Sequence, residues 1–109
     1  MEKFVTRVIA PAADAIAPDG SEVRLLAATE RGSMAHFRLP AGAVSRAVAH
    51  RSVETVAVSA GVSIAIPAGT AFQFRDSGDA PLEAVAVTMP PWPGMDEAIP
   101  VEGVWPATV

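Results

Sequence analysis

The chain has 109 residues, enough for one hydrophobic core and too few for two, so we expect a single domain over residues 1–109. Twelve acidic and eight basic residues give a formal charge of −4, and the basic residues form no run. Because nucleic-acid-binding proteins are expected to carry a basic face with stacking aromatic rings, this composition argues against a nucleic-acid partner. No apolar run approaches the roughly 18 residues of a membrane helix, which argues against a membrane partner.

The composition also limits the chemistry and indicates a compartment. Cysteine is absent, which excludes disulfides, thiolate catalysis and thiolate metal sites. The first residues contain no compact apolar segment followed by a small-residue cleavage site, so we expect no signal peptide. Together these features favour a cytoplasmic protein.

The pattern of the chain is typical of an all-β protein. Ten prolines and eight glycines favour short strands joined by turns. Residues 4–9 can add an edge strand, and further strands are expected at residues 21–29, 33–39, 62–66, 72–75 and 82–89. The prolines that follow exclude a helix or an inner strand. Residues 90–109 are therefore expected to form a proline-rich extended arm on the barrel, with Trp92 and Trp105 as anchors.

Residues 40–76 carry two half-motifs built on glycine and proline. The first reads Gly42, five residues, Val48-Ala49-His50, three residues, Glu54, six residues, Gly61. The second reads Gly61, five residues, Pro67-Ala68-Gly69, two residues, Phe72, three residues, Asp76. These spacings resemble the two signature motifs of the cupin superfamily, G-x5-H-x-H-x3-E-x6-G and G-x5-P-x-G-x2-H-x3-N. The resemblance implies a small cupin-like β-barrel or jelly roll.

The residues that hold a metal in cupins are largely replaced. Metal-binding members take two histidines and a glutamate from the first motif and one histidine from the second. In this chain Val48 and Phe72 stand at the first and last histidine positions, which leaves His50 and Glu54. A catalytic site usually keeps three protein ligands, and hydrocarbon side chains cannot coordinate an ion. The resemblance thus implies a degenerate metal site, and we expect no metal cofactor.

The two motifs also lie unusually close together. They share Gly61, whereas cupins usually separate them by at least a hairpin, which takes roughly a dozen residues. In cupins this hairpin would follow the position of Thr55. Either the chain lacks the hairpin, or the residue numbers run continuously across a loop that is not included in the sequence. An absent hairpin would expose a sheet edge and remove one wall of the cavity.

His50 and Glu54 are the first candidate site residues. Their spacing of four would place both side chains on one face of a single strand, which points into the barrel in the cupin frame. We interpret them as a hydrogen-bonding or acid–base pair that lines a ligand cavity, because a carboxylate raises the pKa of a nearby imidazole. The alternative is a buried polar pair without a ligand. Val48 and Phe72 would fill the space of the ion as an apolar wall.

Three further residues are candidates for the same cavity. Arg46 is in register with His50 and could bind an anion through its guanidinium group. Trp92 would form a lid over the cavity or anchor a dimer contact. His36, the only other histidine, would complete a metal site with His50 and Glu54 if one exists; otherwise it is a surface residue or lies at a subunit contact.

Three functions remain open. The first is a metal-free cupin that binds a sugar-like molecule or a small organic acid through a set of candidate residues: His50, Glu54, Val48, Phe72, Arg46 and Trp92. The second is a metal-dependent enzyme of the isomerase or dioxygenase type, because cupins include both, with His50, Glu54 and His36 as ligands. The third is a non-catalytic dimerising module. The resemblance and the need to cover an open sheet edge predict a homodimer.

Overall fold

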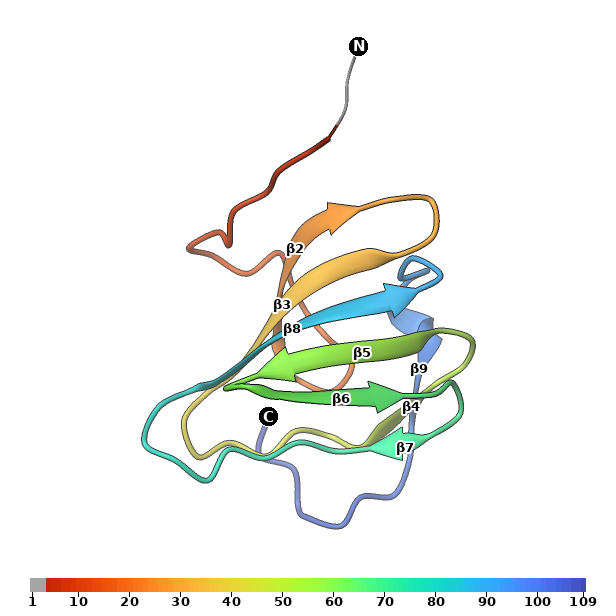
Figure 1. Ribbon diagram of the computed structural model, residues 1–109. Helices are drawn as coiled ribbons and strands as arrows, with labels where there is room; N and C mark the ends of the chain where they lie inside the picture. The colour runs from red at the N-terminus through yellow and green to blue at the C-terminus, as the bar shows by residue number, and fades with distance from the viewer. Residues whose placement is uncertain (1–3) are drawn as a thin grey trace.

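A computed structural model describes residues 4–109 (Figure 1). Over these residues the chain is all β apart from one turn of 3-10 helix. The elements in chain order are β1 (Ala15–Ile16), β2 (Glu22–Ala28), β3 (Ser33–Leu39), β4 (Val48–His50), β5 (Glu54–Ser59), β6 (Val62–Ile66), β7 (Ala71–Phe72), β8 (Leu82–Met89), η1 (Met95–Glu97) and β9 (Ala98–Pro100).

The strands form two unequal antiparallel sheets. The larger has the order β1-β2-β3-β8-β5-β6, and the smaller has the order β7-β4-β9. Because successive side chains alternate across a strand, the pairing of β3, β8, β5 and β6 places Leu39, Thr55, Ile66 and Ala86 on one face of the larger sheet. All four are buried, as is Val48 of the smaller sheet. The core therefore lies between the two sheets, and the expected all-β cupin-like architecture is confirmed.

Most strand predictions agree with the structure. Strands are found over residues 33–39, 62–66 and 82–89 as expected, and the strand expected at 21–29 is β2. The strand expected at 72–75 is wrong beyond Phe72, because Arg75 forms only an isolated bridge with Val44.

The edge strand expected at residues 4–9 is also wrong, since these residues are not in a strand and β1 pairs with β2 instead. The carbonyl groups that follow residue 9 are bound by a side chain: the Arg24 guanidinium donates to the carbonyls of Ala10 at 2.7 Å and Pro11 at 3.0 Å. Pro11 has no N–H to give to a sheet, which further favours an irregular path here.

The hairpin expected after Thr55 is absent from the chain. β5 turns directly into β6 through Ala60 and Gly61, whose φ angles of 50° and 79° are both positive, as in the type I′ class of two-residue hairpin turns. The pairing from Thr55–Ile66 to Ser59–Val62 is unbroken. No segment is hidden by the numbering between the two motifs.

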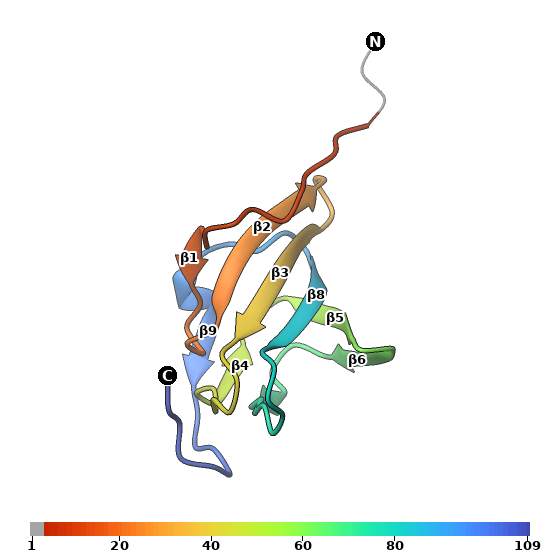
Figure 2. The ribbon, with the colours of Figure 1, turned by 90° about the vertical axis from the view of Figure 1, so that its left-hand side faces the viewer.

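The absent hairpin leaves the inner face of β6 uncovered. Ile66, Ile64 and Val62 share that face, and their exposed fractions rise from 5% through 47% to 70% along the strand towards the turn. Figure 2 shows the β5–β6 hairpin projecting from the rest of the domain. The end of this face nearest the turn is consequently exposed to solvent.

The C-terminal segment lies against the smaller sheet. The Gln73 side chain donates to the carbonyls of Ser45 and Trp105, both at 2.8 Å, and accepts from the N–H groups of Val104 at 3.0 Å and Trp105 at 3.2 Å. The Arg75 guanidinium lies 4.3 Å from the centre of the Trp105 ring. The segment also contains η1 and β9, which the sequence did not predict, and β9 pairs with β4.

We expect Gln73→Ala to lower the free energy of unfolding by about 2 kcal/mol or more, because four hydrogen bonds to the C-terminal segment and Ser45 are lost together. Urea unfolding measures the change. Val104→Ala is the matched control, since the Val104 side chain is 84% exposed and should leave stability unchanged. Equal losses in the two variants would contradict the role given to Gln73.

Candidate functional site

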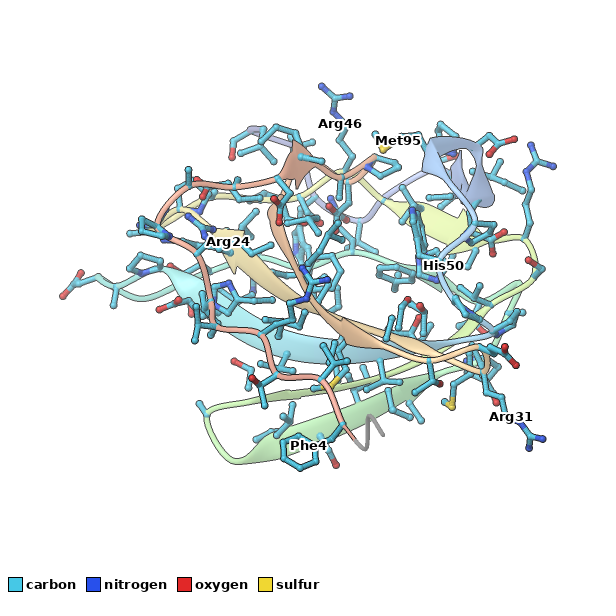
Figure 3. The ribbon with its side chains drawn as sticks, turned by 90° about the horizontal axis from the view of Figure 1, so that it is seen from above. Phe4, Arg24, Arg31, Arg46, His50 and Met95 are labelled. Atoms are coloured by element: carbon cyan, nitrogen blue, oxygen red, sulfur yellow. The ribbon has the colours of Figure 1, made fainter. Side chains whose placement is uncertain are left out.

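His50 lies between the two sheets at the end of β4. Val48 and His50 are two residues apart and share the inner face of the smaller sheet, where Val48 pairs with Phe72. The imidazole is in edge contact with two aromatic rings: the Phe72 ring at a centroid distance of 5.0 Å and the Trp92 ring at 5.2 Å. His50 is 8% exposed, and Figure 3 shows it in the interior of the domain. An imidazole enclosed by aromatic rings is thus the centre of the candidate site.

The imidazole is held on one side by the larger sheet. Its Nδ1 lies 3.3 Å from the hydroxyl oxygen of Thr55, a buried residue of β5. Among residues 4–109 no hydrogen bond is formed to Nε2. Since imidazole has two nitrogen atoms that donate or accept hydrogen bonds, the hydrogen-bonding capacity of Nε2 is not used by these residues.

A buried carboxylate approaches the imidazole from the C-terminal segment. Glu97 accepts hydrogen bonds from the Ser52 N–H at 2.7 Å, the Ser52 hydroxyl at 2.8 Å and the Val53 N–H at 2.8 Å. Burial acts to raise the pKa of Glu97, but these hydrogen bonds and the proximity of His50 outweigh it and hold the pKa below its ordinary value. Glu97 is therefore ionised at neutral pH.

Burial dominates the acid–base behaviour of His50. It lowers the pKa of the imidazole, while the negative charges of Glu97 and Asp19 act in the opposite direction without cancelling it. The net pKa lies below the ordinary value of 6.5. The ring is neutral at neutral pH, with one nitrogen that donates and one that accepts a hydrogen bond.

The predicted pairing of His50 with Glu54 is wrong. The prediction required a single strand, but β4 ends at His50 and β5 begins at Glu54 in the other sheet. The turn at residues 51–53 breaks the alternation on which the argument depended. The Glu54 side chain is exposed, and the carboxylate that acts on His50 belongs to Glu97.

Arg46 is not part of this site either. Its Nε donates to the carbonyl oxygen of Val109 at 3.0 Å, and Figure 3 shows the side chain extending away from His50. Arg46 and His50 are four residues apart, which would place their side chains on one face of a continuous strand. Arg46 lies before β4, which begins at Val48, so the argument does not apply to it.

The alternative metal ligands do not converge. His36 lies on the outer face of the larger sheet, opposite to that of Thr55, and its Nε2 is 2.8 Å from the Glu83 carboxylate. Within the part of the chain that the structure describes, no three side chains of histidine, aspartate or glutamate are placed to hold a metal ion. The residues present therefore do not fit the metal centre that the cupin fold implies.

The structure brings together four of the predicted residues, namely His50, Val48, Phe72 and Trp92. It adds Thr55 and Glu97, which were not predicted as site residues. A buried threonine opposite the imidazole carries no distinctive spacing. Glu97 is far from the motifs in the chain and reaches the site only because the C-terminal segment folds back.

Shallow hollows lie on both sheets of the described residues. One, of about 180 Å³, lies under the C-terminal segment and is bordered by Phe72, Gln73 and Trp105 among others. The second, of about 170 Å³, lies on the outer face beside His36 and Glu83. The first is bordered by Phe72, which contacts the imidazole, and neither hollow is lined by His50.

Comparison with known proteins supports the fold. No family model matches the chain, and no curated protein matches it. The structure is similar to TT1209 from Thermus thermophilus, with a TM-score of 0.58, 17% identity, and coverage of 71% of this chain and 90% of that one. An uncharacterized conserved protein with a double-stranded β-helix domain from Klebsiella pneumoniae gives a TM-score of 0.48 at 13% identity, covering 76% of this chain and 85% of that one.

A cupin-2 domain from Rhodospirillum rubrum also gives a TM-score of 0.48 at 13% identity, covering 93% of this chain and 80% of that one. With its two antiparallel sheets and the glycine and proline frame of both motifs, the chain has the cupin fold. The resemblance inferred from the motifs is confirmed at this level. A fold shared by many functions does not identify the activity.

None of the helical structure in residues 4–109 is long and apolar enough to cross a membrane.

We expect the free energy of unfolding to fall as the pH is lowered from about 7 to 5, since the unfolded chain binds a proton at His50 that the folded chain resists. The folded pKa is the lower one, so this stability is present above the ordinary pKa of 6.5 and is lost as the pH falls through the folded pKa. Glu97, whose folded pKa is also lowered, adds a further loss below its ordinary pKa of 4.5.

Urea unfolding over this pH range provides the measurement. His50→Gln should flatten the dependence between pH 7 and 5, while Glu54→Gln, at an exposed position, should retain it. If the free energy of unfolding of His50→Gln falls with pH as steeply as that of the wild type, a group other than His50 causes the pH dependence.

Proposed function

We propose that this protein is a cupin domain that binds a small hydroxyl-bearing molecule, such as a sugar-like ligand, without a metal ion. The observation that carries the proposal is the neutral imidazole of His50, whose Nε2 forms no hydrogen bond within residues 4–109, in contact with the rings of Phe72 and Trp92. Apolar and aromatic walls with a few placed polar groups are the usual form of a small-molecule site. His50 would exchange a hydrogen bond with the ligand.

The charges around His50 favour a neutral ligand over an organic acid. The three arginines of the central region are engaged elsewhere: Arg46 with the Val109 carbonyl, Arg51 with the Asp96 carbonyl at 2.8 Å, and Arg75 with the Trp105 ring. The charges that act on the imidazole are negative, from Glu97 and Asp19. A carboxylate ligand would meet these charges without a cation to offset them, so a hydroxyl group is the better partner.

The surrounding residues support such a ligand. Trp92 is held in place because its backbone N–H donates to the Ser33 hydroxyl at 3.0 Å, and that hydroxyl lies 2.7 Å from the Thr88 hydroxyl. Val48 supplies the apolar floor next to His50. The exposed part of the inner face of β6, at Ile64 and Val62, is the side from which we propose that a ligand enters.

The metal-dependent alternative lacks this support. An isomerase or dioxygenase of the cupin type would need further metal ligands beside His50, and neither His36 nor Glu54 is near it. Binding without catalysis is therefore the function that we propose. The cytoplasmic location remains a prediction from the sequence.

Thermal unfolding of chelator-treated protein tests the proposal with a panel of monosaccharides and dicarboxylic acids. We expect a monosaccharide to raise the Tm in the presence of the chelator, because ligand binding to the folded state stabilises it. His50→Gln should weaken binding about fivefold, the effect of losing one hydrogen bond of about 1 kcal/mol.

Glu54→Gln is the control and should bind as the wild type does, since Glu54 is exposed outside the site. Stabilisation that requires an added divalent metal, or equal binding by His50→Gln and the wild type, would contradict the proposal. If dicarboxylic acids stabilised the protein and monosaccharides did not, the proposal of a neutral hydroxyl-bearing ligand would be rejected.

A further inference from the structure

β6 is the terminal strand of the larger sheet, and its outer edge has no partner among residues 4–109 (Figure 1). Four of its five residues are exposed, including Val62 and Ile64. An unpaired edge presents free N–H and C=O groups that another strand can bind. This edge is therefore a candidate interaction surface.

Within its five residues the β6 edge has none of the features that usually prevent strand addition, and Pro67 follows only after its last residue. It contains no proline and no bulge, and its pairing with β5 is regular. No charged residue occurs between Glu54 and Arg75, a long interval in a chain of which 18% is charged. Lysine, proline and bulges are the common protections of a natural edge strand.

The opposite edge of the same sheet is protected. β1 has only two residues, and its neighbour Asp14 bonds to β2 by accepting from the Leu25 N–H at 2.7 Å. Pro11 and Pro18 lie on either side. A second strand cannot extend far along such a short edge. The contrast between the two edges indicates that β6 is left open for pairing.

The hairpin geometry determines which backbone groups are free. The two-residue turn makes Ser59 and Val62 a hydrogen-bonded pair, and the alternation along β6 then directs the backbone groups of Ser63 and Ala65 away from β5. Two antiparallel copies of β6 use these groups best when Ser63 faces Ala65 of the other copy. That register forms about four backbone hydrogen bonds and places Ile64 opposite itself.

We propose that β6 pairs with β6 of a second copy of this chain, across a two-fold axis at Ile64, to give one continuous sheet through both molecules. A self-complementary strand satisfies the requirement of a two-fold interface, where the same surface serves both copies. Ile64 meets Ile64 of the other copy, and Val62 meets its Ile66, which are favourable β-branched pairs. Like charges do not oppose this approach, because the hairpin beyond Glu54 carries none.

The pairing limits itself to two copies. It consumes the β6 edge of each molecule, and the edges that remain in the larger sheets are the short β1 strands. The inference rests on the free backbone edge of β6, whereas the proposed ligand site rests on the contacts of the His50 ring with Phe72, Trp92 and Thr55.

Light scattering combined with size-exclusion chromatography tests the assembly. We expect a mass of twice the 11.2 kDa of the chain. Ile64→Lys should halve this mass, because it places two like charges opposite each other at the axis. Val104→Lys, at an exposed position on the C-terminal segment, should remain a dimer. Circular dichroism and the Tm verify that both variants are folded.

Disulfide trapping tests the register, and the absence of native cysteine makes single-cysteine variants unambiguous. Ile64→Cys should form an intermolecular disulfide under mild oxidation, since residues in a non-hydrogen-bonded antiparallel pair have Cα atoms about 4.5 Å apart. Val62→Cys is the matched control on the same face of the strand. In this register the two copies of residue 62 lie roughly 13 Å apart, too far for a disulfide.

A wild-type mass of 11.2 kDa would overturn the proposal and leave the edge for a strand of another protein. A dimer that persists in Ile64→Lys, or equal trapping of Val62→Cys and Ile64→Cys, would place the interface elsewhere. Species larger than a dimer would show that the pairing does not close.

Discussion

The tight turn at Ala60 and Gly61 determines how much of a barrel this chain can build. By joining β5 directly to β6, it removes the segment that would otherwise face the inner side of β6. The larger sheet keeps its six strands, while the smaller sheet has three short ones. The exposed isoleucine and valine on the inner face of β6 and the free sheet edge both follow from this one connection.

The C-terminal segment compensates for part of the lost wall. Glu97 binds the backbone of the β4–β5 turn, and β9 adds a third strand beside β4. The same carboxylate acts on the imidazole of His50, so one ionised group both attaches the segment and sets the electrostatics of the site. Because hydrogen bonds offset the cost of its burial, the carboxylate keeps its charge in the interior.

The fold was more accessible from the sequence than the site. Alternation and the glycine and proline spacing located β3, β6 and β8, because these features depend on neighbouring residues alone. The inward direction of His50, with Val48 and Phe72 beside it, also followed from the motif frame. Glu54 was misplaced because side chains alternate between faces only within one strand, and a turn between two sheets separates Glu54 from His50. Glu97 was out of reach, since its position depends on the folded path of a distant segment.

The hydrogen bonds of Gln73 have a consequence for how the protein forms during synthesis. Gln73 binds Ser45 on one side and Trp105 on the other, and β4 receives its second neighbour only from β9. The smaller sheet cannot be completed until residues up to Trp105 have left the ribosome. The β5–β6 hairpin forms earlier, because its contacts are local in the chain. The smaller sheet, with the His50 site on its inner face, should therefore be the last part of the fold to form.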